Sequence, residues 1–378
     1  MSFDFATAGR ILFGRGVASQ AVSLGREFGS RALLVTGNNT ERAAAVLRGL
    51  DFAIFSTAGE PTVDTARSGA RLARSEGCDL VIGFGGGSAI DAGKAIAALA
   101  TNSGEPLDYL EVVGRGASLR NAPLPFLAIP TTAGTGSEVT RNAVLGSPEH
   151  RVKASLRSPM MLPRIAIVDP DLTMGLPPEI TASTGLDALT QLIEPYVCAR
   201  RNAMVDMFCV EGMRAVSRSL RTAFREGGNH EAREAMSFAS LLGGLALANA
   251  GLGVVHGFAA PIGGMFDAPH GAVCAALLPH GMKANIEALR AHSKNDGLER
   301  YARVAAILTG NPHAAPEDGV EGVQSLCLDL RVPPLRRYGV TQTHVPELSA
   351  KAANASSMKA NPVTLTAADL EQVLKSAL

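Results

Sequence analysis

Two histidines and an aspartate are the residues of this chain best suited to hold a metal ion. His256 and His270 lie in the apolar, glycine-rich segment 251–281, and Asp187 lies in the helical-looking segment TGLDALTQLIEPYV at 184–197. A single histidine on an apolar face is more often a hydrogen-bonded core residue than a ligand. Two histidines with an aspartate make a set that leaves a fourth coordination position open, as catalytic metal sites do. Spacing alone does not separate a core role from a metal role here.

A polar stripe runs along the helical-looking segment. Asp187, Gln191 and Glu194 are spaced to fall on one helical face, which is either a solvated surface or the wall of a site. His280 is a weaker candidate, because it follows the helix-like run AVCAALLP and is placed to cap it. The remaining histidines sit in polar contexts and are predicted to be at the surface: 150, 230, 292, 313 and 344.

A glycine-rich turn predicts a phosphate site. In DLVIGFGGGSAIDAGKAIA, at 79–97, an apolar strand runs into glycines and a helix is expected to start at about Ser88. Glycines let the backbone approach a ligand closely, and free N–H groups at a helix start suit a pyrophosphate. The match to G-x-G-x-x-G is imperfect, and the alternative is a tight strand-to-helix turn. Asp91 and Lys94 are either a surface ion pair or residues that reach into the same cleft.

A second loop, in AIPTTAGTGSEVTRNAV at 128–144, is crowded with hydroxyl groups. Thr131, Thr132, Thr135 and Ser137 follow an expected strand, where a loop built only for turning would favour Pro, Asn and Asp. Ligands of open α/β sheets bind at the carboxyl ends of strands. A cofactor contact is therefore favoured over a bare turn.

These loops need a parallel sheet to position them. Short apolar runs at 32–36, 52–57, 79–84, 125–130 and 164–170 alternate with helical patterns, as in buried parallel strands joined by crossovers. After LTMGLPPEITAST the strand signals stop and the rest is predicted to be helical. We therefore expect an α/β dinucleotide-binding domain at 1–176 and an all-α domain at 177–378, which suits a chain too long for one core.

The amino-acid composition limits the classes of binding partner and the cellular compartment that are expected for the protein. Lys plus Arg and Asp plus Glu are both 35, so the net charge is zero and nucleic acid is not an expected partner. The five cysteines have no C-x-x-C pair and are predicted to be small core residues in a reducing compartment. No signal peptide is expected in the first residues, which favours the cytoplasm. The segment 241–255 is predicted to be a buried helix and not a membrane span.

Taken together, the motifs resemble those of the iron-containing (type III) alcohol dehydrogenases. The shared segments, in the family's order, are FGRG, GGGSAIDAGK, PTTAGTGSEVT, AIVDPDLTMGLPPEI, TGLDALTQLIEPYV, the two-histidine segment and NPVTLTAADLEQVL. The resemblance spans nearly the whole chain. It implies an amino-terminal dinucleotide-binding domain and a helical domain, with the active site in the cleft between them, the fold also found in dehydroquinate synthase. It also implies hydride transfer between a nicotinamide and a small alcohol or aldehyde.

The resemblance carries cofactor roles onto particular positions. Gly86, Gly87 and Ser88 would hold the pyrophosphate, with Asp91 beside the cofactor. Further positions match residues that touch phosphate, ribose or nicotinamide in similar proteins: Thr131, Thr132, Thr135, Asn142 and Lys153.

The metal positions depart from the family pattern. The family uses an aspartate, a histidine one turn later and two further histidines, which here are Asp187, Gln191, His256 and His270. Ala260 stands where many members have a histidine thought to move protons, so the proton path is unassigned. Glutamine is a poorer donor than imidazole for iron or zinc.

The departure at Gln191 leaves three outcomes open: a weak fourth ligand, a partner of substrate or water, or a metal-free site. Glycerol dehydrogenases, which are similar in fold, bind zinc with one aspartate and two histidines. A divalent metal, iron or zinc, held by Asp187, His256 and His270 is therefore favoured.

Gly37 bears on the choice of cofactor. NAD-preferring relatives often have an aspartate here, which would repel a 2'-phosphate, whereas Gly37 and Asn38 offer room and donors. NADP is therefore expected somewhat more than NAD. The resemblance also implies a homodimer.

Three other functions compete with the dehydrogenase. A dehydroquinate synthase-like lyase would need cationic side chains near the metal, but GFAAPIGGMF beside His256 is apolar. A maleylacetate reductase is disfavoured by the form of PTTAGTGSEVT. A metal-free, non-catalytic nucleotide-binding protein is kept open by Gln191 and Ala260.

Overall fold

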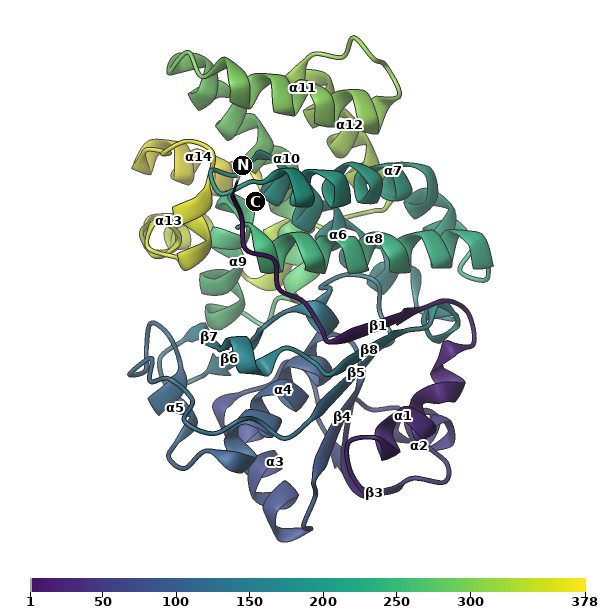
Figure 1. Ribbon diagram of the computed structural model, residues 1–378. Coiled ribbons are helices and arrows are strands. Elements are labelled where there is room, and N and C mark those ends of the chain that lie inside the picture. The colour runs from purple at the N-terminus through teal and green to yellow at the C-terminus, as the bar shows by residue number, and fades with distance from the viewer. Residues whose placement is uncertain (1) are drawn as a thin grey trace. The chain divides into compact units, whose positions relative to one another are not determined.

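A computed structural model describes residues 2–378 of the chain, which form two compact units. Residues 6–132 and 136–174 make up the α/β unit, and residues 2–5, 133–135 and 175–378 make up the helical unit (Figure 1). This confirms the predicted fold class, an α/β amino-terminal part followed by helices. The domain boundary at 176/177 stays a prediction.

The α/β unit is built on a six-stranded sheet in which every pairing is parallel. Its strand order is β1-β8-β5-β4-β2-β3. The strands are β1 (Arg10–Phe13), β2 (Arg31–Thr36), β3 (Asp51–Ser56), β4 (Leu80–Gly85), β5 (Phe126–Pro130) and β8 (Ile165–Val168). Every residue of β4, β5 and β8 is buried, as expected for parallel strands covered on both faces. The five predicted strands are confirmed, and β1 was not predicted.

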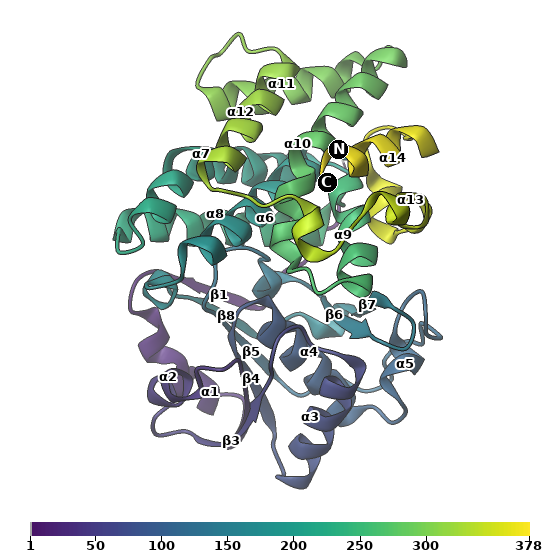
Figure 2. The same cartoon turned by 180° about the vertical axis from the view of Figure 1, so that it is seen from behind.

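Helices cover both faces of this sheet (Figure 2). On one face, α1 (Ala21–Arg26) and α2 (Thr40–Val46) pack on a cluster that includes Leu34 and Ile82. On the other, α3 (Val63–Ser75) and α4 (Gly87–Thr101) pack on a cluster that includes Val35 and Val81. The short α5 (Pro106–Tyr109) and an antiparallel hairpin of β6 (Asn142–Ser147) and β7 (Val152–Arg157) complete the unit.

The strand order reverses between β2 and β4. From β2 the chain goes outward to β3, then returns to the other side of β2 to form β4 and continues toward β5. Such a reversal is the place where open α/β sheets bind ligands, at the carboxyl ends of the strands. Gly37 follows β2 and Gly85 ends β4, and a Cβ on Gly85 would lie 3.7 Å from the Gly37 nitrogen.

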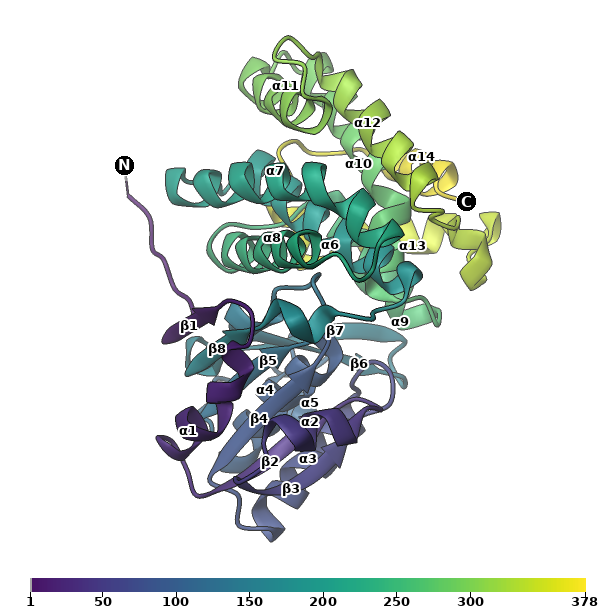
Figure 3. The ribbon, with the colours of Figure 1, turned by 90° about the vertical axis from the view of Figure 1, so that its right-hand side faces the viewer.

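The helical unit packs around one buried helix, α6 (Pro178–Val197), whose residues from Gly185 to Val197 are all buried. Figure 3 shows α6 with α7 and α8, which both pack on it. Small residues allow the close approach: a Cβ on Gly212 of α7 would lie 2.4 Å from Leu192 of α6. The other helices are α7 (Ala203–Arg225), α8 (His230–Asn249), α9 (Val254–Met265), α10 (His270–Ala291), α11 (Asn295–Thr309), α12 (Pro316–Asp329), α13 (Val345–Ala353) and α14 (Ala367–Ser376).

The segment 241–255, predicted to be one buried helix, is not continuous. It comprises the end of α8, a break at 250–253 and the start of α9. The break has a physical cause, because Gly253 lets α9 begin against Asn361 and Glu194, where a Cβ would lie 2.6 Å from the Asn361 Oδ1. Within residues 2–378, no single helix is long and apolar enough to cross a membrane, although α8 and α9 together pass that test as a pair bent by 96°.

Candidate functional site

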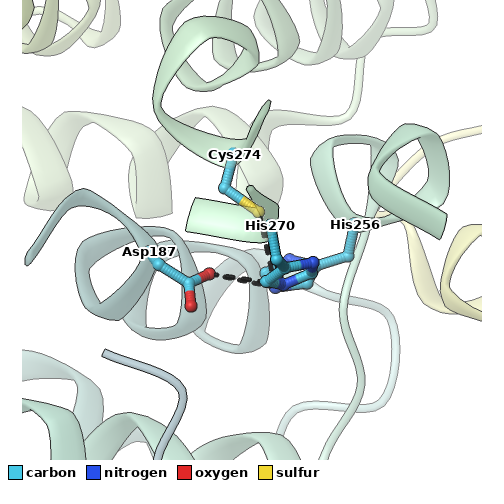
Figure 4. Close-up of side chains that lie close together, drawn as sticks. All are labelled: Asp187, His256, His270 and Cys274. Carbon is cyan, nitrogen blue, oxygen red and sulfur yellow. Dashed lines mark hydrogen bonds and ion pairs between the residues drawn. The ribbon is translucent and has the colours of Figure 1, made fainter. Parts of the chain in front are cut away.

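Four side chains of the helical unit converge on one point (Figure 4). Asp187 comes from α6, His256 from α9, and His270 and Cys274 from α10, and their ligand atoms all lie within 4.8 Å of one another. The Asp187 Oδ1 is 3.6 Å from the Nε2 atom of each histidine. The Cys274 Sγ is 3.7 Å from the His270 Nε2 and 4.0 Å from the His256 Nε2. The structure therefore brings the three predicted strong ligands together and adds a thiol.

The start of α10 is positioned by a glycine. His270 is the first residue of the helix, and a Cβ on Gly271 would lie 2.6 Å from the Ser183 carbonyl oxygen of α6. Only glycine permits this approach of α10 to α6 without displacement of backbone. Cys274 follows His270 by one helical turn, so both side chains lie on the same face of α10.

Glu194 orients His256. Its Oε2 accepts a 2.7 Å hydrogen bond from the His256 Nδ1, and its Oε1 accepts a 2.7 Å bond from the Val255 N–H at the start of α9. With its proton on Nδ1, the imidazole presents the Nε2 lone pair to the cluster. The Val254 N–H donates to Asn361, which comes from the family motif near the carboxyl end. The polar stripe is therefore not a solvated surface at Glu194, whose contacts position His256 and the start of α9.

Two buried oxygen atoms of this region have no hydrogen-bond partner. They are the Asp187 Oδ1 and the Gln191 Oε1, on side chains that are 1% and 2% exposed. The Gln191 Nε2 donates to the Gly134 carbonyl oxygen at 3.1 Å, which fixes the orientation of the amide. Buried polar atoms normally find partners, because an unsatisfied one costs about 1–3 kcal/mol. The orphaned Asp187 oxygen thus marks a place for a ligand.

The charges of the cluster are strongly coupled. Burial raises the pKa of Asp187, but His270 and His256 lower it more, so the net pKa is below its ordinary value. Burial lowers the pKa of His256, yet Cys274, Asp187 and Glu194 raise it well above its ordinary value. The pKa of His270 is raised to about 9 by Cys274 and Asp187 against the effect of burial. One carboxylate, two imidazoles and a thiol are a donor set that fits a divalent metal such as zinc or iron.

The predicted cofactor loops of the α/β unit meet at the reversal of the sheet. The Thr131 N–H donates to the Gly85 carbonyl oxygen at 2.9 Å, and a Cβ on Gly86 would lie 3.2 Å from the Thr132 side chain. No Cβ on Gly37 would touch another atom within 4 Å, so space is open there. The structure therefore brings the loops after β2, β4 and β5 together.

The helix α4 starts as a phosphate-binding helix does. Gly86 is its N-cap residue and offers no side chain to the first N–H groups, of which Gly87 and Ser88 supply two. Those N–H groups have no partner within the helix, and the helix dipole adds positive potential. An anion at this end would satisfy both.

Lys94 is buried and Asp91 is largely covered, with a side chain 14% exposed, so the two are not a surface pair. The Lys94 Nζ is 3.0 Å from the Asp91 Oδ1 and donates to Ser137, Thr140 and the Asn142 carbonyl oxygen. The Asp91 carboxylate also accepts from the Ser137 hydroxyl and the Val144 N–H. This network fastens α4 to the segment that follows the hydroxyl-rich loop.

The other predicted cofactor residues are spread more widely. Lys153 of β7 pairs with Glu60, and Asn38 is exposed after β2. Thr135 belongs with Gly134 to the helical unit. The roles of these residues stay predictions.

The sequence matches a family profile along almost its full length. The profile of the family described as "Iron-containing alcohol dehydrogenase" matches residues 8–170. The profile described as "Fe-containing alcohol dehydrogenase family, C-terminal" matches residues 181–378. The chain belongs to the iron-containing alcohol dehydrogenase family.

Known members of this family resemble the chain closely. It is 36% identical over 351 residues to a 1,3-propanediol dehydrogenase of Klebsiella pneumoniae, covering 88% of each chain. It is 32% identical to an NAD-dependent methanol dehydrogenase of Bacillus methanolicus, covering 97% of each. A solved 1,3-propanediol oxidoreductase superposes with a TM-score of 0.92, at 34% identity and full coverage of both chains.

This family membership makes the protein an oxidoreductase that acts on CH–OH groups with NAD and a metal. The dehydrogenase hypothesis is confirmed over the lyase and the non-catalytic alternatives. One member of the cluster, Cys274, was not predicted as a site residue from the sequence, where it was expected to be only a core residue. Its spacing of one helical turn from His270 was the signal that could have revealed it.

Proposed function

We propose that this iron-containing alcohol dehydrogenase interconverts a small primary alcohol and its aldehyde, with a divalent metal held by Asp187, His256 and His270. The observation that carries the proposal is the preformed cluster with the orphaned Asp187 Oδ1. Two of the relatives named above act, by their names, on 1,3-propanediol and methanol. A short, unbranched substrate is in keeping with both.

The residues of the chain would act mainly by orientation. Glu194 holds the His256 proton on Nδ1, so that Nε2 stays free to bind. His270 is the accessible member, with a side chain 34% exposed against 1% for Asp187. The chemistry that a bound divalent metal supplies is polarisation of the substrate oxygen, and that of the nicotinamide is hydride exchange with the carbinol carbon.

The test is metal analysis of the purified protein combined with an NAD(P)H-oxidation screen over short aldehydes. We expect one class of divalent metal, removed by a chelator together with activity and restored by zinc or ferrous iron. His270→Ala is expected to lose both metal and turnover, whereas His292→Ala, at the end of α10, should keep both. A fully active protein without metal would contradict the proposed site.

For the cofactor, we infer NADP in addition to the NAD that the family uses. The support is Gly37, which leaves open space after β2 where an acidic residue would repel a 2'-phosphate. Gly37→Asp is expected to raise KM for NADPH by at least about tenfold, because juxtaposed like charges cost more than about 1.4 kcal/mol. KM for NADH should change little. A wild-type protein that uses NADH alone, with an unchanged profile in the variant, would contradict the inference.

The remaining binding roles are proposed from the family pattern. Gly86, Gly87 and Ser88 would bind the pyrophosphate at the start of α4, next to Thr131 and Thr132. The predicted homodimer and cytoplasmic location also stand as proposals. Light scattering of the purified protein tests the first, and cell fractionation the second.

A further inference from the structure

Position 191 carries a glutamine where the family pattern has a histidine. Its amide nitrogen is engaged in the fold, while its Oε1 has no hydrogen-bond partner. The Gln191 Nε2 donates to the carbonyl oxygen of Gly134, in the loop that follows Thr132. The two residues pack within the helical unit, where a Cβ on Gly134 would lie 2.7 Å from Thr184 of α6. Gln191 therefore fastens this loop to α6 through its amide nitrogen, and position 191 offers no imidazole to the cluster.

Cys274 brings a fourth donor atom into the cluster. Its side chain is fully buried, and its sulfur points toward the two histidines (Figure 4). In residues 2–378 the group formed by Cys274, Asp187, His256 and His270 is the one metal-binding set of three or more such ligands, and the other four cysteines lie outside it. The Asp187 Oδ1 in the same cluster makes no hydrogen bond although it is buried, which independently indicates that the group holds a ligand.

The distances match a common coordination centre. With metal–nitrogen and metal–oxygen bonds of about 2.0–2.1 Å and a metal–sulfur bond of about 2.3 Å, tetrahedral ligand atoms lie about 3.3–3.6 Å apart. The Asp187 Oδ1 is 3.6 Å from each histidine Nε2. The sulfur is 3.7 and 4.0 Å from the same nitrogens. All four ligand atoms lie within 4.8 Å of one another, and they would have to close to these tetrahedral separations to share one metal.

We propose, on the basis of the metal site proposed above, that Cys274 is the fourth protein ligand of the metal and that Gln191 positions the loop at Gly134 instead of binding metal. Cysteine binds metals as the thiolate, so the ligand set carries two negative charges, on Asp187 and Cys274. A set of one oxygen, two nitrogens and one sulfur favours zinc or iron over magnesium or manganese. The partly exposed His270 side leaves room for the substrate oxygen as a further ligand.

The test is the spectrum of the cobalt-substituted protein. Co(II) bound to a thiolate gives a charge-transfer band in the near ultraviolet, which carboxylate, imidazole and amide ligands do not give. The wild-type protein, loaded with equimolar Co(II), is expected to show this band. Bound cobalt without the band would overturn the sulfur ligand and leave the three-ligand site standing, whereas no bound cobalt would overturn both proposals.

Variants assign the band to one sulfur. Cys274→Ser should remove it and weaken Co(II) binding by more than the roughly 10–100-fold that loss of an outer-shell partner costs. Cys327→Ser, which changes a thiol of α12 outside the cluster, should keep the band and the affinity. A band that survives in Cys274→Ser would overturn the proposal.

Position 191 provides the second comparison. Gln191→Leu should retain the band, because the sulfur remains, and loss of cobalt binding equal to that of Cys274→Ser would overturn the role assigned to Gln191. In the double variant Cys274→Ser with Gln191→His, the returned imidazole is expected to recover affinity without the band. Circular dichroism of each apoprotein, compared with the wild-type protein, identifies variants that do not fold. If a variant does not fold, the presence or absence of the charge-transfer band in the cobalt-loaded wild-type protein decides whether sulfur binds the metal.

Discussion

Two polar clusters of the protein each begin with an aspartate and a second polar residue about one turn later on a helix, but they differ in chemistry. In the α/β unit, Asp91 and Lys94 lie three residues apart on α4, and every polar atom of the pair has a partner. In the helical unit, Asp187 and Gln191 lie four residues apart on α6, and each retains a buried oxygen without a hydrogen-bond partner. The first cluster is complete in the protein alone, and the second is complete only with a ligand.

This difference separates a structural network from a binding site. A buried ion pair with all its hydrogen bonds made fixes the elements that it joins, and removing one partner strands the other. An orphaned oxygen beside two imidazoles and a thiol is tolerated because an added cation satisfies it. Mutation of the first cluster is therefore expected to lower the stability of the protein, whereas a metal is expected to raise it through the second cluster. The expected effects are given from the largest to the smallest.

The largest effect is expected from Lys94→Met. The change leaves Asp91 without its buried partner and removes the donor from Ser137, Thr140 and Asn142, which should cost about 3–5 kcal/mol of unfolding free energy. Urea denaturation measures it. Lys283→Met, which breaks an exposed pair with Glu287, serves as the control and should stay within about 0.5 kcal/mol. Equal effects of the two variants would show that the α4 network is not structural.

Glu138, buried near Lys94, should make the α/β unit sensitive to pH. Burial raises its pKa from 4.5 to about 7, against the opposing effect of Lys94. A raised folded-state pKa gives a contribution that is complete below pH 4.5 and is lost as the pH rises through about 7, in total about 3 kcal/mol. Glu138→Gln cannot ionise, so its stability relative to wild type should rise between pH 4.5 and 7 and then level off. Urea denaturation at several pH values checks this, and parallel pH curves would contradict it.

Metal should stabilise the protein only through the incomplete cluster. A ligand that binds the folded state alone adds about 2.7 kcal/mol at a concentration of 100 Kd. We expect zinc to raise Tm of the wild-type protein and of a Lys283→Met control in step with its concentration. Asp187→Ala should lose this increment, because it removes the orphaned oxygen. A zinc-dependent Tm that persists in Asp187→Ala would place the metal elsewhere.

The sequence predicted the parts of the fold that depend on local pattern. Buried runs gave five of the parallel strands, because both faces of those strands are covered. The hairpin of β6 and β7 was missed although residues 142–147 alternate in burial, since the alternation is weak in residue type. β1 is four residues long and has no buried residue, and its apolar run of three residues is too short to mark a strand by itself.

The site was only partly predictable for a different reason. Asp187, His256 and His270 were assigned through the order of the family motifs, because residue type and spacing alone did not separate a core role from a metal role. Cys274 resembles an ordinary core residue, and only the meeting of α6, α9 and α10 shows its use. Lys94 could not be placed from the sequence, because its acceptors at Ser137 and Asn142 are defined only once the chain has folded.

The smallest effect is expected one contact away from the metal ligands, at Glu194. Glu194→Gln removes the negative acceptor of the His256 Nδ1 proton while keeping the size of the side chain and an oxygen for the Val255 N–H. Loss of such an outer partner typically weakens metal affinity by about 10–100-fold, that is, by about 1.4–2.7 kcal/mol. Competition with a chelating dye measures the affinity, and Glu287→Gln, on the exposed side of α10, is the matched control. An unchanged affinity in Glu194→Gln would mean that helix packing alone orients His256. The ligand-dependent cluster would then consist of Asp187, His256, His270 and Cys274 alone, without Glu194.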